Sequence, residues 1–257
     1  MKPGYAELEF DLPGALLRAI VEMFDNMAPA DLTANNLKRV EEEPGVYALY
    51  SKSTGDLLYI GKAESKKGLH NRLTRHMRKI GGRHHIMPSD VRFKSIRVFV
   101  FAALDLEATL IAFYGGTKKV PWNHSGFGSN DPGKERDTTK YKIDHFDTAH
   151  PIRLDTIFVP ITPGIYTVAE VMQRLKDGLP FLLRFERPNP NSKKSFAPDF
   201  LTSSVTVPAA GMTTRQMVDL CVKSLPTGWQ ATAFPSHIIC YKNDNRKFPS
   251  GTLIAKS

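Results

Sequence analysis

The chain has 257 residues, of which 41% are hydrophobic and 24% are charged, and its net charge is +9. This size and composition are typical of a globular protein with one large or two small domains. No apolar run approaches the length of a membrane span, and the acidic N-terminus lacks the apolar segment of a signal peptide, so we expect a cytoplasmic protein without membrane contact.

Residues 1–40 are expected to be mainly helical. Leu16, Ile20 and Met23 recur at the spacing of one helix face. Asp31 or Thr33 is placed to cap a second helix. The segment has no group of residues suited to chemistry, so we expect an N-terminal helical region that wraps around a domain starting near residue 41.

A β-hairpin is predicted next. Residues 46–50 and 57–60 are short β-type runs, and the polar turn between them contains Gly55, which suits a backbone with positive φ. Gly45, Val46 and Tyr47 open the first run. Tyr59, Ile60 and Gly61 close the second run.

A basic helix is predicted after the hairpin. Arg72 and His76 are four residues apart and therefore share one face. An apolar stripe runs beside them and should pack the helix onto the hairpin. This packing would leave a line of polar side chains along the edge of a groove, namely Arg72, His76, Lys79 and Arg83.

Positive charge is concentrated around this helix. Residues 62–97 contain 11 basic and 2 acidic side chains, a net charge equal to the +9 of the whole chain. Such a cluster indicates a surface for a polyanion. His84 and His85 follow in a loop, where they either contact a phosphate or assist proton transfer, or are simply solvent-exposed.

A third strand over residues 91–102 and a buried helix over residues 105–114 are predicted next. Glu107 lies on this apolar helix, where a carboxylate is costly unless it is paired or binds a cation. Residues 121–137 are too rich in Gly, Pro, Asn and Ser for a regular element and should form a structured loop. In it, Arg136 and Asp137 would anchor the loop to each other or to DNA, or the loop is a structural lid.

The order Gly-Val-Tyr, eleven residues, Tyr-Ile-Gly and then a helix with Arg72 and His76 resembles the GIY-YIG nuclease superfamily. The resemblance covers about residues 40–150, with Val46 in place of the usual isoleucine. It implies an α+β core with a small three-stranded antiparallel sheet flanked by helices. It also implies a set of catalytic residues at matching positions: Tyr47, Tyr59, Arg72, His76, Glu107 and Asn123.

The resemblance also implies roles for these residues in phosphodiester hydrolysis. Tyr47 would activate water, although a phenol with a pKa of about 10 needs nearby cations to do so. Arg72 would hold the phosphate with its planar fork of donors. Glu107 would bind Mg²⁺, and Asn123 would orient the site. Side chains expected to bind DNA are Lys62, Arg75, Lys79, Arg83, His85 and Arg136.

The string NHSGFG followed by DPGKERD resembles a narrower branch, the type II restriction endonucleases that cut the palindrome CCGCGG. This resemblance implies double-stranded DNA as the substrate. A palindromic target implies a two-fold homodimer or a higher homo-oligomer. A cognate DNA methyltransferase would protect the host DNA.

Residues 155–257 differ in composition and are expected to form a separate α+β domain of unknown role. The predicted order β-α-β-β-α-β suggests a ferredoxin-like arrangement. Thr167, with Glu170 three residues later, and Thr213 or Thr214 are plausible helix caps. Cys221 and Cys240 have no metal or redox spacing, so we expect reduced core residues. The domains expected are therefore 1–40, 41–154 and 155–257.

Two other functions remain open. A structure-selective repair or homing-type nuclease would keep the same catalytic residues and read DNA shape or a long site. Such enzymes often carry an appended zinc finger or helix-hairpin-helix module, and the sequence has neither pattern. A non-cleaving DNA-binding protein would have lost one of the catalytic groups, whereas all of them are present.

Overall fold

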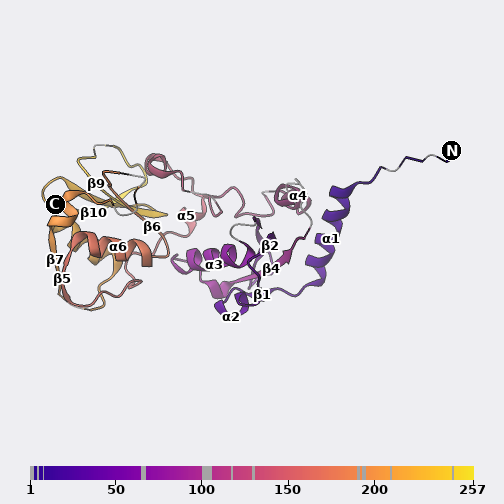
Figure 1. Cartoon of the computed structure of the whole chain (residues 1–257), viewed down its shortest axis with the longest axis horizontal. Coiled ribbons are helices and arrows are strands. Elements are labelled where there is room, and N and C mark those ends of the chain that lie inside the picture. Colours follow the sequence, from indigo (N-terminus) through magenta and orange to yellow (C-terminus); the bar gives the residue numbers. More distant parts are fainter. Residues whose placement is uncertain are drawn as a thin grey trace. The chain divides into compact units, whose positions relative to one another are not determined.

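The computed structural model describes residues 3–4, 6–7, 9–64, 68–99, 106–116, 118–128, 131–189, 192, 195–208, 210–244 and 246–257. These residues form a mixed α+β structure (Figure 1) that divides into two compact units. Unit 1 comprises Met1–Met77 and Pro88–His124, and unit 2 comprises Arg78–Met87 and Ser125–Ser257.

Unit 1 is built on a four-stranded antiparallel sheet with the order β1-β4-β2-β3. The predicted hairpin is confirmed as β2 (Gly45–Ser51) and β3 (Leu57–Ala63). The predicted third strand, β4 (Val91–Arg97), pairs with β2 on its other edge and ends earlier than predicted, while residues 100–105 lie outside the described residues. The two-residue strand β1 (Ala30–Asp31) was not predicted, because so short a strand carries no periodicity.

Successive side chains along each strand point to opposite faces of this sheet. Val46, Ala48, Ile60 and Ile96 belong to one buried cluster with residues of α1 (Leu12–Asn26) and α4 (Leu106–Phe113). Tyr47 points to the opposite face, where it meets the basic helix α3 (Gly68–Gly81). The sheet of unit 1 therefore has one apolar face and one face on which polar side chains meet the basic helix.

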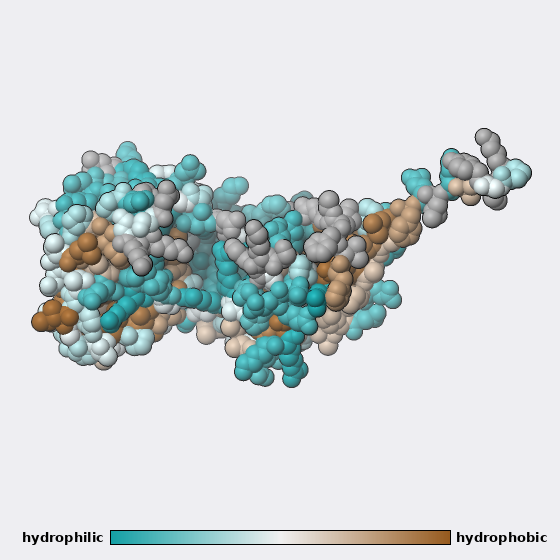
Figure 2. Space-filling view, viewed as in Figure 1, coloured by the Kyte–Doolittle hydropathy of each residue, from teal (hydrophilic) through white to brown (hydrophobic). Residues whose placement is uncertain are grey.

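The N-terminal region folds as part of unit 1 rather than as a domain of its own. Asp11 caps α1, and Thr33 caps the short helix α2 (Ala34–Leu37), as the sequence predicts for Thr33. The outer side of α1 keeps apolar residues such as Leu12 and Met23 exposed. Figure 2 shows brown, hydrophobic surface over this helix. None of the helices in the described residues has the combined length and hydrophobicity that crossing a bilayer requires.

The described residues of unit 2 form two further sheets. One has four strands in the order β10-β8-β9-β6, with β6 parallel to β9 and the other pairs antiparallel. The other is an antiparallel pair of β5 and β7. The strands are β5 (Gly164–Thr167), β6 (Leu182–Phe185), β7 (Ser204–Val207), β8 (Trp229–Ala233), β9 (His237–Lys242) and β10 (Thr252–Lys256).

The helices of unit 2 cover a large apolar core that includes the buried residues Trp229 and Phe200. Thr167 and Thr213 both form the capping boxes that their sequences suggest. Cys221 and Cys240 are buried and unbonded, as expected. The helices are α5 (Phe146–Ala149), α6 (Val168–Gly178), α7 (Pro198–Thr202) and α8 (Thr214–Lys223), and short 3₁₀ turns occupy Pro88–Asp90 in unit 1 and Gly133–Thr138 in unit 2.

The structure differs from the predicted organisation in two respects. The second half is not ferredoxin-like, because within the part of the chain that the structure describes β5 pairs with β7 alone and does not join the sheet of β6. The predicted domain boundary near residue 154 also differs from the observed division after His124. Residues 125–154 belong to unit 2 because their buried side chains, such as Asp137, bond to the strands of that unit.

Candidate active site of unit 1

The two tyrosines of the candidate site come from the paired strands β2 and β3. Tyr47 lies opposite Gly61 in the register, so Tyr59, two residues before Gly61, is its diagonal neighbour on the same face. Their ring centroids are 6.0 Å apart. Tyr47 is fully buried and Tyr59 is 4% exposed. Strand pairing therefore brings both phenols together beneath α3.

Two glycines leave room for this arrangement. A Cβ on Gly61 would lie 2.4 Å from the Tyr47 hydroxyl oxygen and 2.7 Å from a ring carbon of Tyr59. A Cβ on Gly45 would lie 2.1 Å from the carbonyl oxygen of Ile96. The β-strand propensity of the sequence does not reveal that these two glycines are needed for space. The available sequence signal was their place in the tripeptides Gly-Val-Tyr and Tyr-Ile-Gly.

Helix α3 supplies the cationic and imidazole groups. Its first amides are held by the chain before β2, because Leu69 N donates to the carbonyl oxygen of Glu43 and His70 N donates to that of Glu41. One and two turns further on, Arg72 and His76 face the tyrosines, as the four-residue spacing predicts. His76 is 3% exposed and its ring centroid lies 5.5 Å from each tyrosine ring.

A hydrogen-bonded cluster joins these side chains. The Tyr47 hydroxyl lies 2.7 Å from Nε2 of His76, and Arg72 Nε donates to the same hydroxyl oxygen at 3.2 Å. The phenol can donate its proton to His76 Nε2 when the imidazole is the neutral tautomer that carries its own proton on Nδ1.

Burial controls the acidity of the two phenols. It raises the pKa of Tyr47 well above its usual value, and the charge of Arg72 only partly offsets this. The pKa of Tyr59 is raised by burial and then by the negative charge of Glu107. Burial alone would lower the pKa of Arg72, but its interactions with Tyr47 and Tyr59 raise it on balance. Tyr47 is therefore a neutral phenol at rest, contrary to the expectation that nearby cations favour its phenolate.

Glu107 reaches the end of strand β3 from the first turn of α4. Its Oε2 accepts a hydrogen bond from the backbone N of Lys62 at 3.3 Å, and its side chain is half-buried. Within the described residues no three carboxylate, histidine or cysteine groups cluster as metal ligands. A single carboxylate still fits Mg²⁺, which commonly keeps several waters and takes its other ligands from substrate phosphates.

Asn123 acts on the backbone of β3. Its Oδ1 accepts from Ile60 N and its Nδ2 donates to the carbonyl oxygen of Ile60, both at 2.9 Å. Trp122 N donates to the carbonyl oxygen of Leu58, so this loop lies along the free edge of the sheet. Asn123 therefore holds the strand between Tyr59 and Gly61, and the geometry gives it a positioning role.

Three of the expected DNA-binding side chains are engaged inside unit 2. Arg83 is 3% exposed, and its Nη2 lies 2.9 Å from Asp147 Oδ1. Arg136 is paired with the same aspartate at 2.6 Å. Lys79 donates to the carbonyl oxygens of Gly126 and Phe127. These side chains therefore anchor the fold of unit 2, and their contact with DNA stays a prediction.

The other three candidates are exposed. Lys62 and Arg75 lie on the surface of unit 1, and His85 lies in a loop of unit 2 with a φ of 62° beside the ring of His84. Unit 1 carries 15 basic and 14 acidic residues, whereas unit 2 carries 20 and 12. Most of the excess positive charge therefore belongs to unit 2, although the densest sequence window lies around α3.

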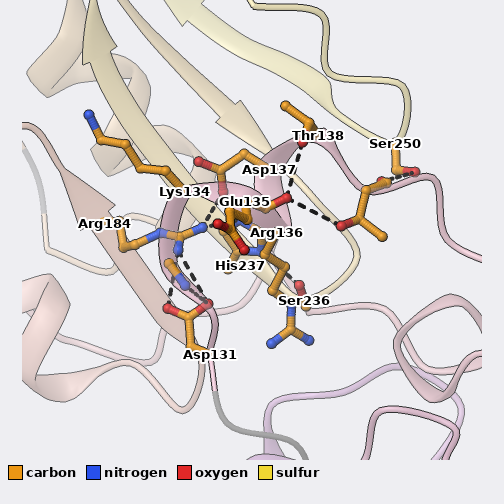
Figure 3. Close-up of polar contacts among 12 residues, drawn as sticks. Asp131, Lys134, Glu135, Arg136, Asp137, Thr138, Arg184, Ser236, His237 and Ser250 are labelled. Carbon is orange, nitrogen blue, oxygen red and sulfur yellow. Dashed lines mark hydrogen bonds and ion pairs between the residues drawn. The ribbon is translucent and has the colours of Figure 1, made fainter.

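A buried polar network in unit 2 was missed at the level of sequence. Asp137 accepts from His237 Nε2 at 2.8 Å and from the Tyr241 hydroxyl at 3.2 Å. Figure 3 shows Arg184 between Asp131 and Asp137 in this network. The partners are separated by 47 to 104 positions, so no local pattern could reveal them. Asp137 thus anchors the loop to the strands of unit 2, a partner that none of the alternatives predicted for this loop had named.

Comparison of the chain with protein-family models and with curated proteins gave no match in either case.

Proposed function

We propose that the protein is a magnesium-dependent endonuclease of the GIY-YIG type that hydrolyses double-stranded DNA. One observation carries the proposal: Tyr47, Tyr59, Arg72 and His76, from three separate elements, form one buried cluster beside which Glu107 is held. A forked cation, two phenols, an imidazole and one carboxylate can supply what phosphodiester hydrolysis requires, which is an activated water, a group that holds the phosphate and a cation for the leaving oxygen. An ordinary hydrophobic core has no use for this combination.

The geometry suggests how the proton moves in this proposal. As water attacks phosphorus, its proton passes to the Tyr47 oxygen while the phenol proton passes to His76 Nε2. The new P–O bond replaces the bond to the 3′ oxygen, which takes a proton from solvent water as it leaves, and His76 afterwards returns its extra proton to solvent. The products are a 5′-phosphate and a 3′-hydroxyl. In this scheme Tyr47 never exists as a free phenolate, which agrees with the raised pKa that burial gives it.

Arg72 and Glu107 hold the reacting groups in this scheme. Arg72 is half-buried, donates to Tyr47 and has further donors on its guanidinium that suit a phosphate oxygen. Glu107 would hold Mg²⁺, which stabilises charge on the leaving oxygen when it is bound. Asn123 keeps strand β3, and with it Tyr59, in register.

The finer proposal is a type II restriction endonuclease that acts on a short palindrome as a homodimer beside a protective methyltransferase. It rests on the resemblance of the segment between Asn123 and Asp137. Plasmid DNA incubated with the full chain and MgCl₂ tests it, with discrete fragments as the expected result. Nicking only at junctions would indicate a repair nuclease, and retardation without cleavage would indicate a binding protein.

The carboxylate substitution Glu107→Gln sharpens this experiment. We expect cleavage to be lost at every MgCl₂ concentration while the affinity for a DNA duplex is retained. Glu22→Gln, on the exposed side of α1, is the matched control and should cleave normally. Undiminished cleavage by Glu107→Gln would remove Glu107 from the mechanism.

A further inference from the structure

The turn formed by residues 142–145 of unit 2 presents an isoleucine directly to solvent. Ile143 is 91% exposed, more than any other large apolar side chain among the described residues. The turn is closed by a hydrogen bond from His145 N to the carbonyl oxygen of Lys142 at 3.2 Å. The same carbonyl oxygen accepts from the Thr148 hydroxyl at 2.9 Å, so the corner that carries Ile143 has a defined conformation.

The chain on the N-terminal side of this turn is firmly anchored. Tyr141 N donates to Ser250 Oγ at 3.2 Å, and Ser250 Oγ donates to the carbonyl oxygen of Thr139. The Tyr141 hydroxyl lies 2.8 Å from Ser236 Oγ and accepts from Arg136 Nε at 3.1 Å. Figure 3 shows Ser236 and Ser250 in this network.

The C-terminal side is anchored as well. The His145 ring packs edge-on against Tyr141, with centroids 4.8 Å apart, and its Nδ1 accepts from Asp147 N at the start of α5. Phe146 and Asp147 are buried. A rigid base on both sides means that the exposure of Ile143 is a fixed property of the fold, so binding would cost little ordering of the turn.

The surroundings of Ile143 fit a polyanion. Lys140 and Lys142 flank it and are exposed, and among the described residues neither forms an ion pair. Asp144 is the one acidic residue of the turn. Unit 2 as a whole has 20 basic residues against 12 acidic ones. An apolar tip between lysines is the combination by which proteins insert a wedge between base pairs and bind the flanking phosphates.

We propose that the 142–145 turn is a DNA wedge, in which Ile143 inserts between stacked base pairs from the minor groove while Lys140 and Lys142 contact phosphates. This inference rests on the proposed function in that it takes double-stranded DNA as the partner. It assigns to unit 2 a direct share in DNA binding that the catalytic cluster of unit 1 does not require.

Side-chain insertion unwinds the duplex, so the test measures linking number. The full chain carrying Glu107→Gln, which prevents cleavage, is bound to closed circular plasmid, and the DNA is then relaxed by a topoisomerase. We expect the protein with native Ile143 and the Ile143→Leu variant to lower the linking number of the plasmid per bound protein. The Ile143→Ala variant should lose most of that shift. Ile143→Ala should also bind a short mixed-sequence duplex about tenfold more weakly.

Two sets of control variants separate insertion from other effects. Ile165→Ala removes another exposed isoleucine of unit 2, which is 74% exposed on β5, and should leave both measurements unchanged. Lys140→Gln and Lys142→Gln should each lower the salt dependence of binding by about one unit of slope, yet retain unwinding at saturation. Thermal unfolding should be unchanged in all of these surface variants.

The outcomes of these experiments test the DNA wedge separately from the proposed endonuclease activity. An unwinding shift that survives Ile143→Ala overturns the wedge even if the native chain cleaves DNA. Ile143-dependent unwinding without cleavage by the native chain leaves the wedge standing and overturns the endonuclease. Absence of duplex binding overturns the wedge, because the tip then has no DNA to enter. An oligomer in sedimentation that the Ile143→Ala substitution dissociates also overturns it, because the tip is then a protein contact.

Discussion

The Tyr47 hydroxyl and Nε2 of His76 are 2.7 Å apart, and both side chains are almost completely buried. The two residues are separated by 29 positions and belong to different elements, so only the tertiary fold brings them together. In a site from which water is largely excluded, a hydrogen bond of this length gives a direct path for a proton. It also means that neither side chain can be changed without affecting the other.

Substitution of Tyr47 by Phe removes this path and leaves the ring in place. If Tyr47 passes a proton to His76, we expect the rate of DNA cleavage to fall by about 10²- to 10⁴-fold, with duplex affinity nearly unchanged. Single-turnover cleavage and duplex titration measure the two quantities. Tyr50→Phe, on the same strand but in the opposite cluster, is the control and should cleave at the native rate. A normal rate for Tyr47→Phe would place the water-activating group elsewhere.

The ion pair of Arg83 and Asp147 predicts that Arg83 contributes much more to stability than Arg75, although the two arginines look alike in the sequence. Arg83→Ala leaves the buried carboxylate of Asp147 with fewer partners, so we expect unfolding free energy to fall by about 3–5 kcal/mol. Arg75→Ala, at an exposed position of α3, should change stability by less than about 0.5 kcal/mol but weaken duplex binding. Urea unfolding and titration of a duplex at several salt concentrations measure both effects. Equal stability of the two variants would contradict the structural role of Arg83.

The buried His237 predicts loss of stability in mild acid. Burial lowers its pKa from 6.5, although Asp137 partly offsets this, and Arg184, Ser236 and Phe234 also face the ring. The folded state therefore holds a proton less tightly than the unfolded state. The stability that the neutral ring contributes is complete above about pH 6.5. It is lost as the pH falls from there through the lower pKa of the folded state.

This sign can be checked with urea midpoints measured between neutral pH and pH 5. We expect the midpoint to decline with acidification in the native chain and to decline less steeply in His237→Gln. His84→Gln, at an exposed loop position, should retain the native slope. Identical slopes for the native chain and His237→Gln would assign the acid sensitivity to other groups, such as His145 and His150, whose pKa values burial also lowers.

Local patterns predicted the hairpin, the basic helix and the third long strand of unit 1, but not the two-residue strand β1. Tertiary contacts decided what local patterns could not. The hairpin and the basic helix were recognisable because alternation and four-residue spacing are properties of short segments. The role of Lys79 was not recognisable, because a lysine facing solvent and a lysine bonded to the Gly126 carbonyl oxygen have the same local sequence. The parallel pairing of β6 with β9 likewise depends on chain reversals far apart in the sequence. Burial similarly decided the acidity of Tyr47, which its basic neighbours had seemed to govern at the level of sequence.

The space above Gly61 supplies a last prediction. A methyl group there would overlap the Tyr47 hydroxyl oxygen at 2.4 Å and its ring carbon Cζ at 2.5 Å, distances that cannot be accommodated without moving the ring. Gly61→Ala should therefore displace Tyr47 from His76 and lower the cleavage rate about as much as loss of the hydroxyl does. The φ angle of Gly61 is not positive, so an alanine fits the backbone conformation of strand β3. The expected effect of Gly61→Ala is therefore one of packing.

A double-mutant cycle distinguishes this packing effect from a general loss of stability. In a Tyr47→Leu background the overlapping hydroxyl and Cζ are absent, so adding Gly61→Ala should cost much less unfolding free energy than it costs in the native chain. We expect a coupling of about 0.5–3 kcal/mol between the two positions, as for residues in direct contact. Urea unfolding of the four proteins gives the coupling, and single-turnover cleavage by Gly61→Ala shows whether the displaced ring affects the chemistry. A coupling near zero would mean that the close approach of Gly61 and Tyr47 does not determine where the phenol lies.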